Sequence, residues 1–215
     1  MKYEAIIFDL DGVLVFTDQY HFLAWKKIAD ELGIFFDQNM NNALRGVSRA
    51  ESLEIILQNS SLQLTAEEKA RVLREKNAYY KELLTELEPS AVKENVRNML
   101  TVLKQKGLKL AVGSSSKNTK YILQKTDLAK YFDAVSDGTN ITCSKPDPEV
   151  FLKAAEMLHV PPENCMVVED AEAGIDAAKA GCMYAIGIGT AAKYDKTDYG
   201  IADLIELQNH KLLYK

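Results

Sequence analysis

The stretch Ala5-Ile6-Ile7-Phe8-Asp9-Leu10-Asp11-Gly12 decides the fold, because a short apolar run ends there in two acids and a glycine. Such a run predicts a buried strand followed by a turn. Similar apolar runs occur at residues 109–114, 165–170 and 183–189, with a weaker one near Phe132. Helical patterns separate them, at residues 94–106, 117–124, 148–158 and 171–180. This alternation predicts an α/β fold with a Rossmann-like, doubly wound parallel sheet.

Residues 17–89 interrupt the alternation of strands and helices. Their patterns are helical throughout, and residues 48–51 and 65–68 match the capping box that begins a helix. The first strand is therefore separated from the second by a helical insertion. We expect a four-helix cap domain at residues 17–89, inserted into a catalytic core formed by residues 1–16 and 90–215.

The composition excludes several classes of function. The chain has 215 residues, 47% of them hydrophobic, and a formal net charge of -5, which suits one domain with an insertion. A general nucleic-acid or membrane-surface binder would carry an excess of basic residues instead. A membrane span needs an apolar run of about 18 residues, and the sequence has none of that length. The three cysteines lack metal-ligand spacing and are expected to be buried, reduced thiols. We expect a cytoplasmic monomer that acts on a small molecule.

Polar side chains gather where the predicted strands end. They are Asp9 and Asp11 after the first strand, Ser114 after the second, Lys145 in the loop after the weaker strand, and Glu169 and Asp170 after a later one. Each of them alone also fits a turn or the N-cap of the next helix. Because ligands bind beyond the carboxyl ends of strands in open α/β sheets, their convergence on one edge favours an active site.

The two acids of the first strand suit phosphoryl transfer. Asp9 and Asp11 lie two positions apart, about 7 Å along an extended chain, so they face one side. One carboxylate can attack phosphorus to form an acyl phosphate, while the other reaches the oxygen that enters or leaves. Acids beside a phosphate need a cation, and magnesium prefers carboxylate and phosphate oxygens. Asp9 and Asp170 are its natural ligands, with Glu169 as a ligand or an outer-shell partner.

Two further groups would stabilise the phosphate. Lys145 and the hydroxyl of Ser114 would balance charge on the oxygens of the transferring group. Ser115, Ser116 and Lys117 run into a predicted helix start, where free backbone amides favour anions. Ordinary N-capping explains these serines equally well.

The motifs Asp9-Leu10-Asp11-Gly12-Val13-Leu14, Ser114, Lys145-Pro146 and Glu169-Asp170 follow one another along the chain. Together they resemble the four motifs of the haloacid dehalogenase superfamily, in the expected order and over essentially the whole chain. The resemblance implies a Rossmann-like core with a helical cap, Asp9 as nucleophile and Asp11 as general acid/base. It also implies Mg2+, for which the candidate ligands are Asp9, Asp11, Glu169 and Asp170.

A narrower resemblance lies mostly in the cap. Residues 20–25, 44–49 and 116–118 are similar to the β-phosphoglucomutase family, which interconverts β-D-glucose 1-phosphate and glucose 6-phosphate through bound glucose 1,6-bisphosphate. The resemblance implies that Arg49 holds the phosphate that is not being transferred, and that His21, with Lys76, links cap closure to the acid/base step. The implied substrate-binding residues are His21, Trp25, Arg45, Gly46, Val47, Ser48, Arg49, Lys76, Ser115, Ser116, Lys117 and Asn118.

Two positions depart from the pattern of that family. Phe16 stands where an acid is usual, so hinge hydrogen bonding would have to come from Asp18 in a shifted register, and Arg45 stands where a lysine is usual. Arg45 keeps the charge but presents a planar fork, so sugar selectivity can differ. Other residues keep simpler explanations at this stage, since Trp25 also suits a cap core, Ser48 an N-cap and His21 a structural role.

The leading hypothesis is a Mg-dependent phosphomutase acting on a sugar phosphate, which is formally an isomerase. A sugar-phosphate phosphatase of the same superfamily shares every core residue and differs in letting water attack the aspartyl phosphate. An inactive phosphate-binding regulatory protein is a third hypothesis, which the complete set of core groups disfavours.

Overall fold

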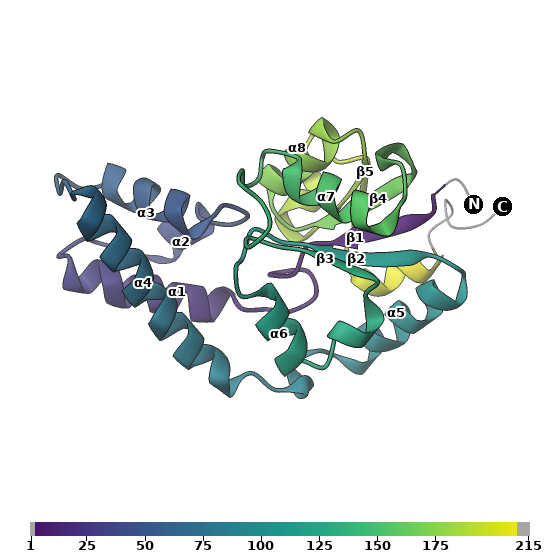
Figure 1. Cartoon of the computed structure of the whole chain (residues 1–215), viewed down its shortest axis with the longest axis horizontal. Helices are drawn as coiled ribbons and strands as arrows, with labels where there is room; N and C mark the ends of the chain where they lie inside the picture. Colours follow the sequence, from purple (N-terminus) through teal and green to yellow (C-terminus); the bar gives the residue numbers. More distant parts are fainter. Residues whose placement is uncertain (1–2, 210–215) are drawn as a thin grey trace.

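The structure, a computed structural model, describes residues 3–209 of the chain. Within these residues six strands form one sheet in the order β3-β2-β1-β4-β5-β6, and all neighbouring strands are parallel. The strands are β1 (Ala5–Phe8), β2 (Lys109–Gly113), β3 (Ala134–Ser136), β4 (Cys165–Glu169), β5 (Tyr184–Ile188) and β6 (Tyr199–Ile201). The α-helices are α1 (Asp18–Glu31), α2 (Gln38–Asn42), α3 (Arg49–Gln58), α4 (Ala66–Leu83), α5 (Glu94–Gln105), α6 (Thr119–Lys125), α7 (Glu149–Leu158) and α8 (Glu172–Ala180). The predicted α/β class is confirmed (Figure 1).

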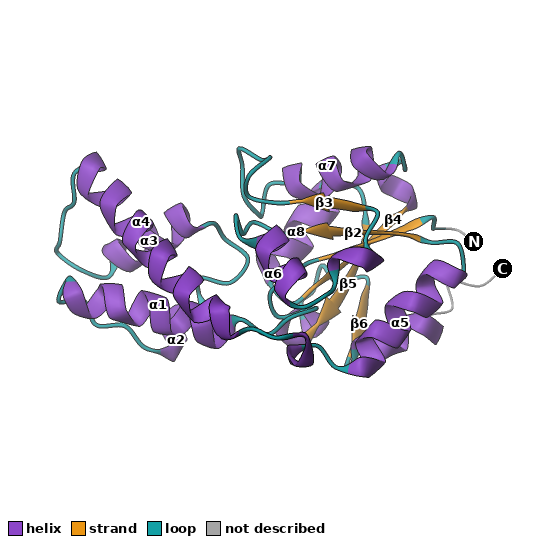
Figure 2. Cartoon of the chain, turned by 60° about the horizontal axis from the view of Figure 1, so that its bottom comes forward, coloured by secondary structure: helices purple, strands orange, loops and turns teal. Residues whose placement is uncertain are grey.

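The burial of β1 explains why an unbroken apolar run forms it. All four of its residues are fully buried. Ile6 packs in a cluster that includes Met99 of α5, on one face of the sheet. Ile7 points to the other face and packs in a cluster that includes Phe151 of α7. Helices thus cover both faces (Figure 2), and a strand between them has no side that favours polar residues.

The strand register brings the polar strand ends together. Phe8 lies opposite Val112 of β2 on one side and Val168 of β4 on the other. Because the three strands are parallel, the residues that follow them leave the sheet at the same edge. This edge carries Asp9, Ser114 and Asp170, as the sequence predicts.

Two details of the core differ from expectation. The edge strand β6 was not predicted, because its three residues form no apolar run and two of them are exposed. Among the cysteines only Cys165 is buried, whereas Cys143 and Cys182 are exposed. The expectation of three buried thiols is therefore wrong, and the reason is that the two exposed residues lie outside helices and strands.

Between β1 and α5, the described chain forms α1–α4 and no strand of the sheet. Both predicted capping boxes are present, with Ser48 before α3 and Thr65 before α4. These helices enclose an apolar cluster of their own, which includes Trp25, Leu53 and Val72, and they gather beside the sheet in Figure 1. The cluster supports a separate cap, and its boundaries at residues 17 and 89 stay a prediction. In the described residues, no helix combines the length and apolar character that crossing a membrane requires.

Replacing Thr65 by alanine is expected to lower the free energy of unfolding by about 1 kcal/mol. The backbone N–H of Glu68 donates to the Thr65 hydroxyl at 3.3 Å, and the Glu68 carboxylate accepts from the Thr65 N–H at 2.8 Å. Urea unfolding measures the loss, and Thr65→Ser, which keeps the hydroxyl, is the matched control. Equal midpoints for the alanine variant and the wild type would contradict a stabilising cap.

Candidate active site

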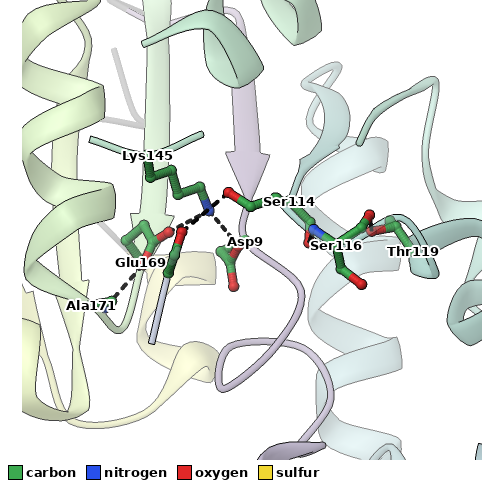
Figure 3. Close-up of polar contacts among 9 residues, drawn as sticks. Asp9, Ser114, Ser116, Thr119, Lys145, Glu169 and Ala171 are labelled. Carbon is green, nitrogen blue, oxygen red and sulfur yellow. Dashed lines mark hydrogen bonds and ion pairs between the residues drawn. The ribbon is translucent and has the colours of Figure 1, made fainter. Parts of the chain in front are cut away.

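A buried lysine joins two carboxylates at the carboxyl edge of the sheet. The Nζ of Lys145 lies 2.5 Å from Oδ1 of Asp9 and 2.5 Å from Oε1 of Glu169 (Figure 3). Lys145 and Glu169 have no exposed surface, and Asp9 is 6% exposed. The loop before α7 supplies the lysine, and β1 and β4 supply the acids, so three separate chain segments build this centre.

The charges of this centre shift one another's pKa values. Burial raises the pKa of Asp9 well above its usual range, Lys145 opposes that rise, and Glu169 and Asp170 add to it. Burial alone would lower the pKa of Lys145, but the two carboxylates outweigh it and raise the value. The lysine therefore stays protonated, and removing it would leave buried acids without a counter-charge.

Asp11 is held by the segment that leads into α1. The hydroxyl of Thr17 donates to Oδ1 of Asp11, and an isolated bridge pairs Asp11 with Val15. Burial raises the pKa of Asp11, while the Thr17 hydroxyl opposes the rise. A carboxyl with a raised pKa that lines a cavity suits proton transfer near neutral pH.

Three acids at this edge fit a hard cation. Oxygen atoms of Asp9, Glu169 and Asp170 all lie within 4.8 Å of one another. Both Glu169 oxygens already have donors, Lys145 and the N–H of Ala171 at 2.9 Å, so Glu169 suits an outer-shell role. Burial and the charge of Glu169 raise the pKa of Asp170 to about 7, against the opposing charge of Arg45. Such crowded acids are what a magnesium ion would stabilise.

Close packing at this site requires glycine at position 12. Gly12 has a φ of +86°, and a Cβ there would lie 2.2 Å from Oδ2 of Asp170. Any side chain at this position would push that carboxylate aside. The Asp-Gly turn after β1 is therefore a means of bringing the Asp170 carboxylate close to the first strand.

The loop after β2 is organised by its own hydroxyls. The Ser114 hydroxyl accepts from the N–H of Ser116 at 3.2 Å, and the Ser116 hydroxyl accepts from the N–H of Asn118 at 3.2 Å. The Thr119 hydroxyl donates to the Ser116 carbonyl at 2.9 Å (Figure 3). The helix begins at Thr119, two residues later than expected, and no side chain caps it. These serines shape the loop and are not the helix N-cap.

On the cap side, Lys76 of α4 is buried among aromatic rings. Its Nζ lies 3.1 Å from Nδ1 of His21 and stands 5.0 Å from the ring centre of Trp25 and 4.5 Å from that of Tyr80. Burial, followed by the charge of Arg49, lowers the pKa of Lys76 to about 7. Burial, followed by the charges of Lys76 and Arg49, holds the pKa of His21 well below its usual value. Neutral His21 can then accept a hydrogen bond from Nζ of Lys76 through its Nδ1.

Arg49 has an unmet hydrogen-bonding capacity. It is the first residue of α3, and its Nη1 is buried with no hydrogen-bond partner among the described residues. A buried donor without an acceptor is costly. The group is therefore placed for a ligand that brings an acceptor, such as a phosphate.

These groups share one cavity of about 630 Å³ between the cap and the core. Cap and core also touch directly, since the Ser115 hydroxyl donates to the Gly46 carbonyl at 3.1 Å and the Asn118 amide donates to Asn77 Oδ1 at 3.0 Å. Of the residues that the sequence nominates, Lys145 and Glu169 lie behind the cavity wall. The others line it: Asp9, Asp11, His21, Trp25, Arg45, Gly46, Val47, Ser48, Arg49, Lys76, Ser114, Ser115, Ser116, Lys117, Asn118 and Asp170.

Sequence reasoning missed several lining residues. Thr17 and Tyr80 could have been found from the sequence. Thr17 directly precedes the first cap helix, and Tyr80 lies one helical turn after the nominated Lys76. Asp18 is suggested by the sequence only as an acid that could compensate for Phe16, and nothing in the sequence connects it with Asn41, because the two are 23 residues apart and only the packing of α1 against α2 brings them together. Trp25 lines the cavity and is buried in the cap cluster, so its place in the cap core is confirmed and its role in substrate binding stays a prediction.

Comparisons with known proteins bear on the family and the fold. The sequence model of the haloacid dehalogenase-like hydrolases matches residues 3–181. A β-phosphoglucomutase of Bacillus subtilis (strain 168) is 44% identical over 188 residues, which covers 86% of this chain and 83% of that protein. A phosphorylated carbohydrates phosphatase of Thermotoga maritima is 36% identical over 180 residues, with 82% of this chain and 81% of the relative covered. The crystal structure of β-phosphoglucomutase from Clostridium difficile matches with a TM-score of 0.90 at 37% identity, covering 95% of this chain and 93% of that one.

Replacing Lys76 by methionine is expected to raise the free energy of unfolding, most strongly at and below neutral pH. The folded pKa of about 7 lies below the ordinary 10.5, so between these values only the unfolded chain holds the proton and wild-type stability rises with pH. The difference in free energy of unfolding between Lys76→Met and the wild type should therefore shrink by about 2 kcal/mol between about pH 7 and pH 9. Urea unfolding at both pH values measures it, with exposed Lys81→Met of the same helix as control. An advantage that does not change with pH would contradict a neutralised Lys76.

Proposed function

The chain belongs to the haloacid dehalogenase-like hydrolase family, and on that premise we propose that it is a β-phosphoglucomutase. It would interconvert β-D-glucose 1-phosphate and glucose 6-phosphate through an aspartyl phosphate at Asp9 and bound glucose 1,6-bisphosphate. A 44% identical relative and a solved structure of TM-score 0.90 both carry that name, which supports the assignment.

The observation that carries the proposal is a single cavity with two separate places for an anion. Beside Asp9, the Ser114 hydroxyl lines the cavity and the charge of Lys145 lies directly behind Asp9, so both can stabilise a transferring phosphoryl group. On the cap, the buried Nη1 of Arg49 lacks an acceptor among the described residues. A phosphatase for a monophosphate needs the first place, whereas a mutase must hold a hexose with a phosphate at each end. The second place therefore favours the mutase.

In the proposed cycle, phosphorylated Asp9 gives its phosphoryl group to the 6-hydroxyl of β-glucose 1-phosphate, and Asp11 takes the hydroxyl proton. The resulting bisphosphate turns round in the cavity. Asp9 then attacks the phosphorus at C1, and Asp11 returns the proton to the departing C1 oxygen, which yields glucose 6-phosphate. The raised pKa of Asp11 supports both of its steps, because a proton donor and acceptor works best near the operating pH. Arg49, with Ser116, Lys117 and Asn118, would hold the other phosphate.

We also propose that Mg2+ is the cofactor, with Asp9 and Asp170 as side-chain ligands, Asp11 as a further candidate and Glu169 in support. The ion would neutralise charge on the phosphoryl oxygens when bound. Lys145 would balance the remaining acids and orient Asp9. In the same proposal the protein acts as a cytoplasmic monomer on small sugar phosphates and binds neither nucleic acid nor membrane.

The second candidate function is a sugar-phosphate phosphatase. The T. maritima relative is a phosphorylated carbohydrates phosphatase, and water could attack the same aspartyl phosphate. The specific observation in its favour is Phe16, which lines the cavity in the segment between β1 and α1 and is 70% exposed. Its side chain cannot supply the hinge hydrogen bonds that an acid at this position would make. A regulatory role without catalysis has no such support, since every core group is present.

With β-glucose 1-phosphate, magnesium and a trace of bisphosphate, glucose 6-phosphate is expected to form at least about 100 times faster than free phosphate, a gap of roughly 2.7 kcal/mol between barriers. Enzymatic detection of glucose 6-phosphate and a phosphate assay follow both products in one reaction. Asp9→Asn keeps the volume but removes the nucleophile, so it should fold and lose both products. Equal rates of the two products would make the protein a phosphatase, and normal turnover by Asp9→Asn would exclude the aspartyl phosphate.

Asp170→Asn is expected to raise the magnesium concentration needed for half-maximal activity by more than about tenfold, a loss typical even of residues that only support a metal ligand. The reason is that a hard cation needs the charge that asparagine lacks. A magnesium titration of activity measures the shift. Asp176→Asn on α8, whose carboxylate pairs with Lys196, removes an equal charge elsewhere and should leave the titration unchanged. Overlaying curves for Asp170→Asn and the wild type would show that Asp170 is not a ligand.

A further inference from the structure

One carboxylate in the cap collects three donors beside the cavity and has no role in the proposed chemistry. Asp18 begins α1, directly after Thr17, whose hydroxyl donates to Asp11. Asp18 is therefore joined to Asp11 through its neighbour Thr17. This hydrogen bond places the start of the first cap helix beside the reaction centre.

The three donors come from a different part of the cap. Oδ1 of Asp18 accepts from the Asn41 amide at 3.1 Å and pairs with Nε of Arg45 at 3.4 Å. Oδ2 accepts from the Gln38 amide at 3.2 Å. Asn41 is only 3% exposed, so its amide has few alternatives to this carboxylate. One side chain thereby fastens α2 and the loop after it to the start of α1.

The fastened loop is the one that meets the core. Gly46, which follows Arg45, accepts a hydrogen bond from Ser115 of the phosphate loop. A Cβ on Gly46 would lie 3.3 Å from the Cβ of Ala171, the residue after Asp170. The same loop continues through Ser48 to Arg49. A shift of this loop would therefore move groups on both sides of the cavity.

Arg45 meets Asp18 through its Nε, which lies 3.4 Å from Oδ1. Among the hydrogen bonds of the described residues, none involves either of its two Nη atoms. Both Asp18 and Arg45 line the cavity. A guanidinium pinned through Nε keeps its two terminal nitrogens in a defined plane, which suits recognition of hydroxyl or phosphate oxygens.

We propose that Asp18 is a positioning residue for sugar-phosphate binding, which acts by holding Arg45 and its loop against the cavity. The inference rests on the proposed function for the identity of the ligand. Ion pairs as exposed as this one contribute little to stability. Removing the Asp18–Arg45 ion pair is therefore expected to weaken ligand binding and to leave the free energy of unfolding almost unchanged.

A double-mutant cycle tests the proposal with a readout that does not need turnover. Trp25 is the chain's single tryptophan, and it lines the cavity, so its fluorescence can report the Kd for glucose 6-phosphate. Asp18→Ala and Arg45→Ala should each weaken binding about tenfold, within the range of coupling measured for contacting residues. In the Arg45→Ala background, Asp18→Ala should add little. Asp30→Ala, which removes an exposed ion pair with Lys26 from the same helix, should leave Kd unchanged.

Kinetics separate positioning from general damage to the cap. Asp18→Ala should raise KM for β-glucose 1-phosphate while leaving kcat, and phosphorylation of Asp9 by acetyl phosphate, close to wild type. Asp18→Asn can still accept a hydrogen bond from Asn41 but lacks the charge that pairs with Arg45. Its KM should therefore lie between those of the wild type and Asp18→Ala. Unchanged Kd in Asp18→Ala, or an equal loss in the wild-type and Arg45→Ala backgrounds, would overturn the proposal. Failure of the mutase assignment would appear separately, as free phosphate released by the unmutated protein.

Discussion

The arrangement of the site depends on one interaction, the burial of Lys145 between Asp9 and Glu169. An ammonium without exposed surface is stable only beside negative charge, and here two carboxylates lie 2.5 Å from it. The three residues come from the ends of β1 and β4 and from the loop before α7, so the parallel register of the sheet is a condition for the contact. In return, the lysine allows the sheet edge to hold acids that would otherwise repel one another.

The cap shows the opposite charge balance. Arg49 and Lys76 lie near each other, His21 is kept neutral, and Asp11 is the acid that partly supports Lys76. Buried like charges of this kind destabilise the folded chain. Core and cap therefore present an acidic and a basic side to one cavity, and a phosphate bound between them with its cation would be complementary to both. The electrostatics favour closing the cap over a ligand more than over water alone.

The sequence predicts the fold and most of the site because both follow local patterns. The run at Ala5 to Phe8 is apolar since both faces of β1 are covered, and Asp9 and Asp11 follow it directly. The capping boxes at Ser48 and Thr65 are likewise visible in four consecutive residues. The features that the sequence does not reveal depend on contacts between distant segments. One example is the short edge strand β6, which has no apolar run of its own and forms by pairing with β5.

The Asp18 network makes the same point about the cap, and it bears on how relatives of one family come to differ. The sequence nominates Arg45 for the substrate but does not connect it with Asp18 or Asn41, and only the packing of α1 against α2 makes the three residues a unit. The reaction centre leaves little room for change, because Gly12 already touches Asp170 and Lys145 already joins two acids. Differences in the sugar that is accepted must therefore arise in the cap loops. A network that fixes such a loop can alter affinity while the groups that transfer the phosphoryl group stay the same.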